Sequence, residues 1–341
     1  MTDILLMDIY QKFTKAIEAA SNIIISTHTF PDADGIGSQI SLGMALQKIG
    51  KKVICVNDEP LLERYHYLDP KRIVLGLEEF KKMSFPKTDL VIVVDTNKVD
   101  RTGSNFANFA KNLNCPILYI DHHPCEKSIR EGHCIDTTAA ATGQLVGNLI
   151  RHIKVPFDKD IALPLYTAIL IDTSSFRYPT VTADTHRMIA DLMDAGVDAP
   201  MAYNGIYGTK KDFNLHLLGK VLSSTHTAMD GQIAWISLQK SDLKNYKTDI
   251  EDTHAYINHL LVLENIKVAC MFRADGDIIK LSLRSTGEYD VGHIAVHLGG
   301  GGHSHSAATI IQYQGRTFEQ AVQETINEIE KVIKEKIPSF N

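Results

Sequence analysis

Short apolar runs alternate with segments of helical periodicity through about the first two hundred residues of the chain. Turn-forming residues bound each run, which is typical of strands joined by helices in βαβ units. The alternation therefore predicts an α/β domain built on a doubly wound, mainly parallel sheet. The predicted strands cover residues 22–27, 52–56, 90–95 and 116–121. The predicted helices cover residues 38–49, 138–153, 161–170 and 183–194.

The pattern changes in the second half of the chain. From Gln232 onward it becomes strand-like over residues 232–238, 266–272 and 277–283, and residues 274–277 read as a hairpin turn. Helical segments near 249–263 and over 318–336 flank these strands. We therefore expect a second, smaller α+β domain. The predicted division is a first domain over 1–196, a linker over 197–221 and a second domain over 222–341.

Length and charge narrow the range of functions. A chain of 341 residues suits two domains, each large enough to bury its own core. The 35 basic residues nearly balance the 41 acidic ones, which gives a formal net charge of −6. Such a surface does not grip long duplex nucleic acid, which proteins hold through many basic contacts to phosphates. A nucleotide ligand would need a metal ion and a few placed cations.

The remaining composition indicates a cytoplasmic protein. The N-terminus lacks the basic and apolar regions of a signal peptide, and no run of about 18 apolar residues is present to cross a membrane. The five cysteines are odd in number and show no C-x-x-C pairing, which fits reduced thiols. Cys125 and Cys134 lie near the candidate site and could form a thiolate zinc site, but isolated cysteines usually behave as small core residues, so we interpret all five as structural.

Three of the predicted strands end in acidic residues or histidines. In open parallel α/β sheets, ligands bind outside the carboxyl ends of the strands. An aspartate at a strand end is more often a helix cap or a turn former, so each residue alone is weak evidence. The coincidence at three strand ends favours one shared site. Its residues are His28, Asp32, Asp34, Asp95, Asp121, His122 and His123.

Asp172, which ends the apolar run 168–171, adds a further carboxylate to this set. Oxygen donors with two imidazoles and no sulfur favour octahedral Mn²⁺ or Mg²⁺ over a closed zinc site. Two such ions roughly 3.5–4 Å apart supply hydroxide at neutral pH and stabilise an in-line displacement on phosphorus. The reaction class that this chemistry implies is phosphoester hydrolysis.

The same residues resemble the motifs of the DHH phosphoesterases. Residues 28–38, 93–95, 121–124 and 171–176 are similar to the first, second, third and fourth motifs, in that order. The resemblance implies that Asp34 and Asp95 are shared by two Mn²⁺ ions, that Asp121 orients a ligand imidazole, and that His123 lies near the scissile phosphate. Arg177 is a candidate phosphate contact or a surface residue. The implied metal ligands are His28, Asp32, Asp34, Asp95, His122 and Asp172.

A glycine run near the C-terminus is the second candidate site. Its backbone N–H groups can face an anion without side chains in the way, although a glycine run also forms simple turns. An arginine on the predicted strand before it offers a fork that matches phosphate. This combination resembles the DHHA1 domain, whose motifs bind a substrate phosphate or nucleotide. The implied contacts are Arg284, Ser285, Gly300, Gly301, Gly302 and His303.

The two resemblances together cover nearly all of the chain. With both domains in this order, the chain resembles the NrnA-type nanoRNases. They imply a manganese-dependent hydrolase, with Mg²⁺ as the other candidate metal, that acts on short single-stranded oligoribonucleotides and on 3′-phosphoadenosine 5′-phosphate. A phosphodiesterase for cyclic di-AMP or pApA is the alternative. A silent nucleotide-binding regulator is disfavoured, since all six ligand positions hold competent donors. The oligomeric state is left open, with a homodimer as one option, and no membrane partner is expected.

Overall fold

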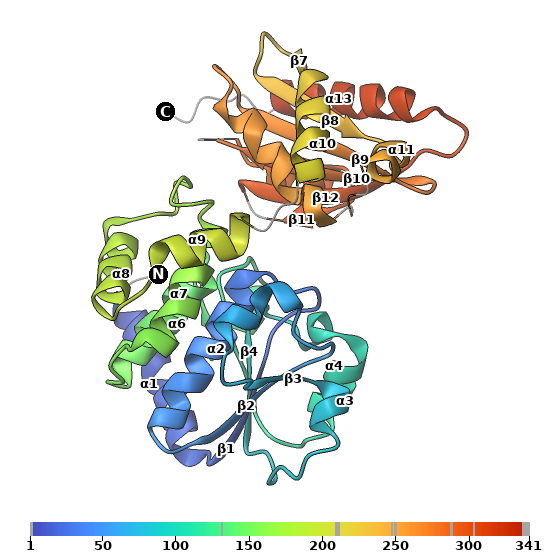
Figure 1. The fold of residues 1–341 in the computed structure, drawn as a ribbon. Coiled ribbons are helices and arrows are strands. Elements are labelled where there is room, and N and C mark those ends of the chain that lie inside the picture. The colour runs from blue at the N-terminus through green and yellow to red at the C-terminus, as the bar shows by residue number, and fades with distance from the viewer. Residues whose placement is uncertain are drawn as a thin grey trace. The chain divides into compact units, whose positions relative to one another are not determined.

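The computed structural model describes residues 3–130, 132–208, 212–246, 248, 251–286, 289–302 and 304–335. The chain divides into two compact units, Met1–Thr209 and Lys210–Asn341. Figure 1 shows the helices and strands of each unit. Helices α9 (Ala199–Tyr207) and α10 (Asp212–Ser223) occupy much of the segment 197–221, which is predicted as a linker.

The first unit is built on a six-stranded sheet in which every paired strand is parallel. The strand order is β3-β2-β1-β4-β5-β6, which confirms the doubly wound α/β fold. The order reverses between β1 and β4, and in sheets of this kind ligands bind outside the carboxyl ends of the strands at such a point. The strands are β1 (Asn22–Ser26), β2 (Lys52–Asn57), β3 (Val74–Gly76), β4 (Leu90–Val94), β5 (Ile117–Asp121) and β6 (Cys134–Ile135).

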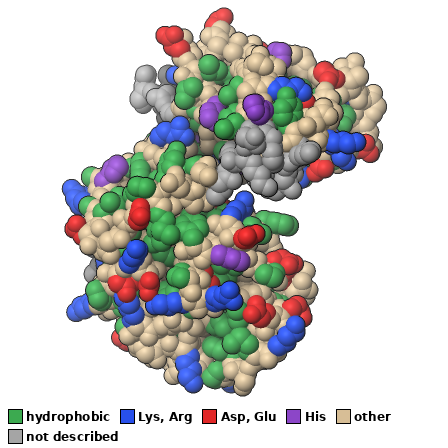
Figure 2. All heavy atoms as spheres, in the orientation of Figure 1, with side chains coloured by type: hydrophobic (Ala, Val, Ile, Leu, Met, Phe, Trp, Pro, Cys, Tyr) green, Lys and Arg blue, Asp and Glu red, His purple; other side chains and the backbone are tan. Residues whose placement is uncertain are grey.

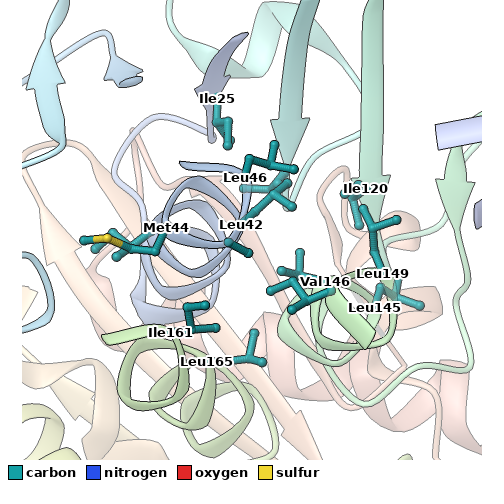
Figure 3. Packing of buried hydrophobic residues seen from close by; sticks show 14 of the residues in the cluster. Ile25, Leu42, Met44, Leu46, Ile120, Leu145, Val146, Leu149, Ile161 and Leu165 are labelled. Carbon is teal, nitrogen blue, oxygen red and sulfur yellow. The ribbon is translucent and has the colours of Figure 1, made fainter. Parts of the chain in front are cut away.

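Helices cover both faces of this sheet, and alternate residues of each strand point to opposite faces. Ile23 and Ile25 of β1 belong to the larger core, while Ile24 belongs to the core on the other face. Figure 3 shows the larger core, where helices α2, α6 and α7 pack near the strands. The helices of this unit begin with α1 (Asp3–Ala19), α2 (Ala33–Lys48), α3 (Leu77–Phe80) and α4 (Ser104–Lys111). They continue with α5 (Lys127–Arg130), α6 (Thr142–His152), α7 (Lys159–Asp172) and α8 (Ala183–Asp194).

The second unit contains a mixed six-stranded sheet, in order β11-β12-β10-β9-β8-β7. Only β8 and β9 pair in parallel among its described strands, and β9 and β10 form the predicted hairpin. These strands are β7 (His226–Ala228), β8 (Ile233–Leu238), β9 (Val268–Asp275), β10 (Ile278–Ser285), β11 (Gly301–Gly302) and β12 (Ser306–Gln312). The remaining helices are α11 (Lys240–Asn245), the 3₁₀ helix η3 (Glu251–Val262), α12 (Val291–His297) and α13 (Phe318–Glu335).

Separate apolar clusters lie on the two faces of this second sheet. Phe272 and Ile326 belong to the cluster that includes helix α13, and Met271 and Leu217 belong to the cluster that includes helix α10. The smaller α+β domain expected from the sequence is therefore present. Within the described part of the chain, no helix combines the length and apolar character needed to span a membrane.

Candidate metal centre

The acidic and histidine residues come together where the order of the first sheet reverses. His28 follows β1, Asp95 follows β4, and His122 and His123 follow β5, at the carboxyl ends of three adjacent parallel strands. Helix α2 starts beside them, and Asp172 is the last residue of helix α7. The sheet therefore brings residues that are far apart in sequence to one edge.

Three overlapping groups of side chains are close enough to share a cation. Within each group the ligand atoms lie within 4.8 Å of one another. Asp95 belongs to two of the groups, and so does His122. The groups are His28, Asp32 and Asp95; Asp34, His122 and Asp172; and Asp95, His122 and His123.

The imidazole of His28 presents a lone pair to the site. Its Nδ1 lies 2.8 Å from the carbonyl oxygen of Thr29, which is an acceptor, so in the neutral ring Nδ1 carries the proton. The Nε2 lone pair then faces Asp95 Oδ2 at 3.3 Å. Two acceptors at this distance need a proton or a cation between them. This geometry fits a metal ion.

Asp34 is buried and held by the start of another helix. The backbone N–H groups of Thr142 and Gly143, in the first turn of α6, donate to its two carboxylate oxygens at 2.8 Å each. Helix α6 has no side-chain cap of its own, because Ala141 stands at its N-cap. Asp34 therefore caps α6 from a distance and lies at the positive end of the helix dipole. Even so, burial and then the charge of Asp172 raise the pKa of Asp34 well above its usual range.

Asp95 lies at the centre of the cluster and is 2% exposed. Its Oδ1 accepts a hydrogen bond of 2.9 Å from the hydroxyl of Thr142. Its backbone φ of 61° is in the left-handed region, which non-glycine residues adopt mainly where the surroundings enforce it. Burial and then the charge of Asp34 raise the pKa of Asp95 well above its usual range. Such a pair of buried carboxylates is stabilised by bound cations.

His122 joins the second group through its Nε2 atom. This atom lies 3.2 Å from Asp172 Oδ2, 3.8 Å from Asp34 Oδ2 and 3.9 Å from Asp95 Oδ1. On the other side of the ring, Nδ1 lies 3.4 Å from the carbonyl oxygen of Ala139. The ring therefore directs Nε2 toward three carboxylates, as a metal ligand would.

Asp121 and His123 form a pair beside this cluster. His123 Nδ1 lies 2.7 Å from Asp121 Oδ1, and Asn97 Nδ2 donates to Asp121 Oδ2, also at 2.7 Å. Burial alone raises the pKa of Asp121, but the hydrogen bond from His123 and the nearby histidine charges outweigh it, so the pKa lies below its usual value. Asp121 thus stays ionised and fixes the ring of His123, with a further contact between His123 Nδ1 and Asp95 Oδ1 at 3.7 Å.

Two residues of this site were not found from the sequence. Thr142 holds Asp95 through its hydroxyl and Asp34 through its backbone N–H, and Asn97 holds Asp121. Asn97 stands two positions after Asp95, so its place past a strand end was the available signal. Arg177 is exposed and donates to the backbone and hydroxyl oxygens of Ser174 at 2.8 Å each.

The glycine run of the second unit is explained in part by packing. Gly299, with a φ of 82°, ends helix α12, and the N–H groups of Gly299 and Gly300 return to the carbonyls of Val296 and Ala295. A Cβ on Gly300 would lie 2.2 Å from the carbonyl oxygen of Ala308 in β12. Gly302 is similarly crowded, while a Cβ on Gly301 would meet no atom within 4 Å. His303 lies outside the described residues.

Arg284 and the glycine strand lie at the same level of the second sheet, on either side of β12. Arg284 pairs with Ser306 of β12, and Gly302 pairs with the next residue, Ala307. Adjacent strands are about 4.8 Å apart, so the arginine backbone and the glycine backbone lie roughly 10 Å apart. The Arg284 guanidinium donates to the carbonyl oxygen of Leu283 at 2.9 Å.

Ser285 differs from the role that the resemblance implies. It is 1% exposed, and its hydroxyl lies 2.5 Å from the carbonyl oxygen of Tyr289 and 3.1 Å from that of Ser304. The side chain therefore ties together the two loops beside the glycine strand. Almost none of its surface is exposed to contact a substrate directly.

Known proteins resemble this chain in sequence and in domain order. The profile of the DHH family, N-terminal domain, matches residues 22–169, and that of the DHHA1 domain matches residues 237–335. The chain is 28% identical over 329 residues to a protein of Thermus thermophilus named bifunctional oligoribonuclease and PAP phosphatase NrnA, covering 95% of this chain and 93% of that one. A Bacillus subtilis protein of the same name is 25% identical over 85% of this chain and 89% of its own length.

A solved structure extends the likeness to the whole chain. An exopolyphosphatase-related protein from Bacteroides fragilis superposes with a TM-score of 0.86 at 26% identity, covering 97% of this chain and 98% of that one. The fold and the site define a two-domain hydrolase of the phosphoesterase class. The chain carries an N-terminal domain of the DHH family, followed by a DHHA1 domain.

Proposed function

We propose that this protein hydrolyses phosphoester bonds in very short oligoribonucleotides and in 3′-phosphoadenosine 5′-phosphate, with two Mn²⁺ ions, or Mg²⁺ in their place, as cofactors. The observation that carries the proposal is the convergence of Asp34, Asp95 and His122, all buried, with lone pairs directed into one space. The names of the two NrnA relatives support this substrate class.

In this proposal each metal ion is held mainly by one group of donors. His28 and Asp32 would hold one ion, His122 and Asp172 the other, and Asp34 and Asp95 would be shared. When bound, such ions lower the pKa of a water ligand and stabilise charge on the phosphoryl oxygens. Thr142 keeps Asp95 oriented through its hydrogen bond of 2.9 Å. Three of these six donors, Asp34, Asp95 and His122, are buried.

Two further contributions come from residues outside the ligand set. Asp121 fixes the ring of His123, which we assign to a phosphate oxygen near the metal ions. In the second unit, Arg284 and the backbone of the glycine strand would bind another phosphate of the substrate, and His303 is included on the resemblance alone. Ser285 would position the neighbouring loops through its buried hydroxyl.

A panel of substrates tests the proposal. We expect Mn²⁺-dependent release of mononucleotides from a diribonucleotide and of AMP from 3′-phosphoadenosine 5′-phosphate, after purified protein has been stripped with a chelator and reloaded. Asp95→Asn should abolish both reactions while the circular dichroism spectrum is retained. Asp184→Asn, an exposed carboxylate on α8, should behave as the wild type.

The panel also includes pApA and cyclic di-AMP, because the same donors would serve their hydrolysis. Faster turnover of either compound than of the diribonucleotide would replace the proposed substrate with the alternative. Near-normal turnover by Asp95→Asn would contradict the metal assignment itself.

A further inference from the structure

Phe30 is placed in a way that the stability of the fold does not explain. Its side chain is 93% exposed, more than any other large apolar residue in the described part of the chain. Its φ is 50°, in the left-handed region, which is unfavourable for a bulky residue. Pro31 follows, and proline pushes the preceding residue toward extended backbone. The ring thus gains almost no packing in return for an unfavourable conformation.

Both flanks of Phe30 are nonetheless fixed. On one side, the N–H of Thr29 donates to the carbonyl oxygen of Arg101 at 2.8 Å. On the other side, Asp32 is the N-cap of α2 and accepts from the N–H groups of Asp34 and Gly35 at 2.9 and 3.3 Å. The backbone on both sides of Phe30 is therefore anchored, while its ring is exposed to solvent.

The ring stands beside the candidate metal centre. Phe30 is two residues from His28 and two from Asp32, so its Cα lies within about 7 Å of the Cα of each, the reach of two extended residues. The turn that anchors Thr29 carries exposed Lys98 and Arg101. An exposed aromatic face is thus combined with cations and a metal site, which are the features that bind a base and a phosphate of one nucleotide.

We propose that Phe30 is a stacking platform for the nucleobase next to the scissile phosphate, and that it makes the enzyme prefer nucleotides, purines above all, over phosphoesters without a base. This proposal rests on the proposed function and deepens it. Stacking suits a side chain that offers a flat face and no hydrogen-bonding group, and such contacts tolerate any base. Preference among bases then follows from stacking strength.

Kinetics of two variants test the platform. Base stacking on an aromatic residue is worth about 1–3 kcal/mol, so Phe30→Ala should lower kcat/KM for ApA about 5- to 150-fold. The ratio of kcat/KM for ApA to that for its abasic analogue should fall by a similar factor, and the advantage of ApA over UpU should shrink. Phe30→Tyr should retain most of the activity. Met193→Ala, another exposed apolar residue of the same unit, is the matched control and should match the wild type.

Fluorescence gives a readout independent of turnover. The chain has one tryptophan, Trp235, which is buried in the second unit. Phe30→Trp adds an exposed reporter, whose emission AMP should quench in the metal-free protein and in the Mn²⁺-loaded protein, while ribose 5-phosphate should not. The Trp235 signal of the parent protein provides the baseline.

The outcomes separate the two proposals. Equal kcat/KM of wild type and Phe30→Ala on ApA would overturn the platform and leave the proposed function standing. If the wild type hydrolyses no nucleotide, the proposed function fails, and the fluorescence experiment still decides the platform. Quenching of Phe30→Trp by AMP but not by ribose 5-phosphate would support it, and absence of quenching by AMP would overturn it. A shift of Phe30→Ala to a smaller species in size-exclusion chromatography would assign the ring to a contact between copies of the chain and overturn the proposal.

Discussion

At the scale of single residues, the metal centre concentrates like charges that the fold alone does not neutralise. Asp34 and Asp95 are both buried, and burial raises the pKa of each; the charge of Asp172 adds to the rise for Asp34, and the charge of Asp34 adds to the rise for Asp95. Hydrogen bonds from α6 and from Thr142 offset only part of the cost of burying them. Protons or metal ions must supply the remainder, so both should be linked to stability.

The first prediction concerns the metal-free protein. Because their folded pKa values are raised, Asp34 and Asp95 hold more protons in the folded than in the unfolded state, so they make the free energy of unfolding fall as pH rises. This fall begins near the unfolded pKa of about 4 and continues up to the folded values. Denaturant titrations from pH 4 to 8 in chelator should show a smaller decrease for Asp95→Asn than for wild type.

Mn²⁺ provides the control for that experiment. An ion that binds only the folded state stabilises it by mass action, so wild type should gain stability at pH 8 on addition of Mn²⁺, and Asp95→Asn should gain less. If the free energy of unfolding fell equally with pH in the two metal-free proteins, ionisation of Asp95 would not destabilise the fold, which would contradict the prediction.

The second prediction concerns Thr142, whose hydroxyl donates to Asp95. Thr142→Val keeps the shape and removes the donor, and loss of such an orienting partner typically weakens metal binding about 10–100-fold. Titration calorimetry with Mn²⁺ measures this directly. Thr142→Ser retains the hydroxyl and should stay close to wild type. A Val variant with unchanged affinity would mean that Asp95 needs no such orientation.

The sequence predicted the donors of the centre better than their supports. The donors follow strands, and strand ends can be located from apolar runs. Thr142 and Asn97 act on residues 47 and 24 positions away, which no local pattern reveals. Ser285 shows the converse: its motif was visible, but its burial depends on two loops that close over it.

At the scale of elements, α2 and α7 approach so closely that the contact requires glycine. A Cβ on Gly37 of α2 would lie 2.2 Å from the carbonyl oxygen of Pro164 in α7. Because the obstacle is backbone, a whole helix must move to admit a methyl group. These two helices carry Asp34 and Asp172, so their spacing also sets the spacing of two proposed ligands.

The third prediction follows from this contact. Gly37→Ala should lower the free energy of unfolding by about 1–3 kcal/mol or more, the usual cost of overpacking, and should also weaken Mn²⁺ binding. Gly219→Ala, in α10 where a Cβ meets no atom within 4 Å, should instead be neutral or stabilise by up to about 1 kcal/mol. Guanidinium denaturation of both variants measures the contrast, and equal stabilities would refute the close packing.

Two glycines, Gly35 and Gly37, explain why the start of helix α2 was predicted too late in the sequence. Helix α2 was expected to begin at residue 38 but begins at Ala33, so Asp34 lies in its first turn and not in a loop. Gly35 and Gly37 are poor helix formers in isolation. Asp32 caps the helix at this end, which stabilises its first turn. Neighbouring atoms leave no room for a Cβ at either position, which is why both residues are glycine.

Other differences between the predicted and the observed elements also have physical reasons. The strands β3 and β6, of three and two residues, are too short to show periodicity and were missed. The four longer strands of the first sheet were placed within a residue or two, because strands buried on both faces are continuous apolar runs. The predicted helix over 183–194 agrees with α8 at both ends, where Thr182 forms a capping box.

At the scale of the whole molecule, charge bears on the length of the substrate. On the face that Figure 2 shows, Lys and Arg side chains are scattered among Asp and Glu side chains. With a net charge of −6, the surface offers little to hold a long chain of phosphates. Binding energy must then come from the few nucleotides that contact the proposed sites.

The fourth prediction is that hydrolysis is fastest for about two to four nucleotides, falls steeply beyond roughly five and is negligible on duplexes. A time course that compares a dinucleotide with a strand of about 24 nucleotides at equal concentration measures this. Equal or faster degradation of the long strand would indicate an extended binding surface and contradict the prediction.

The capping of α6 by Asp34 also bears on how such a protein evolves. Asp34 supports a helix from 108 positions away in addition to its proposed role as a ligand, and a lost cap costs about 1 kcal/mol. Asp32, in contrast, is exposed. Descendants that lose catalysis but keep the fold should therefore lose exposed ligands such as Asp32 first. An aspartate at position 34 should be retained, because the fold still needs it.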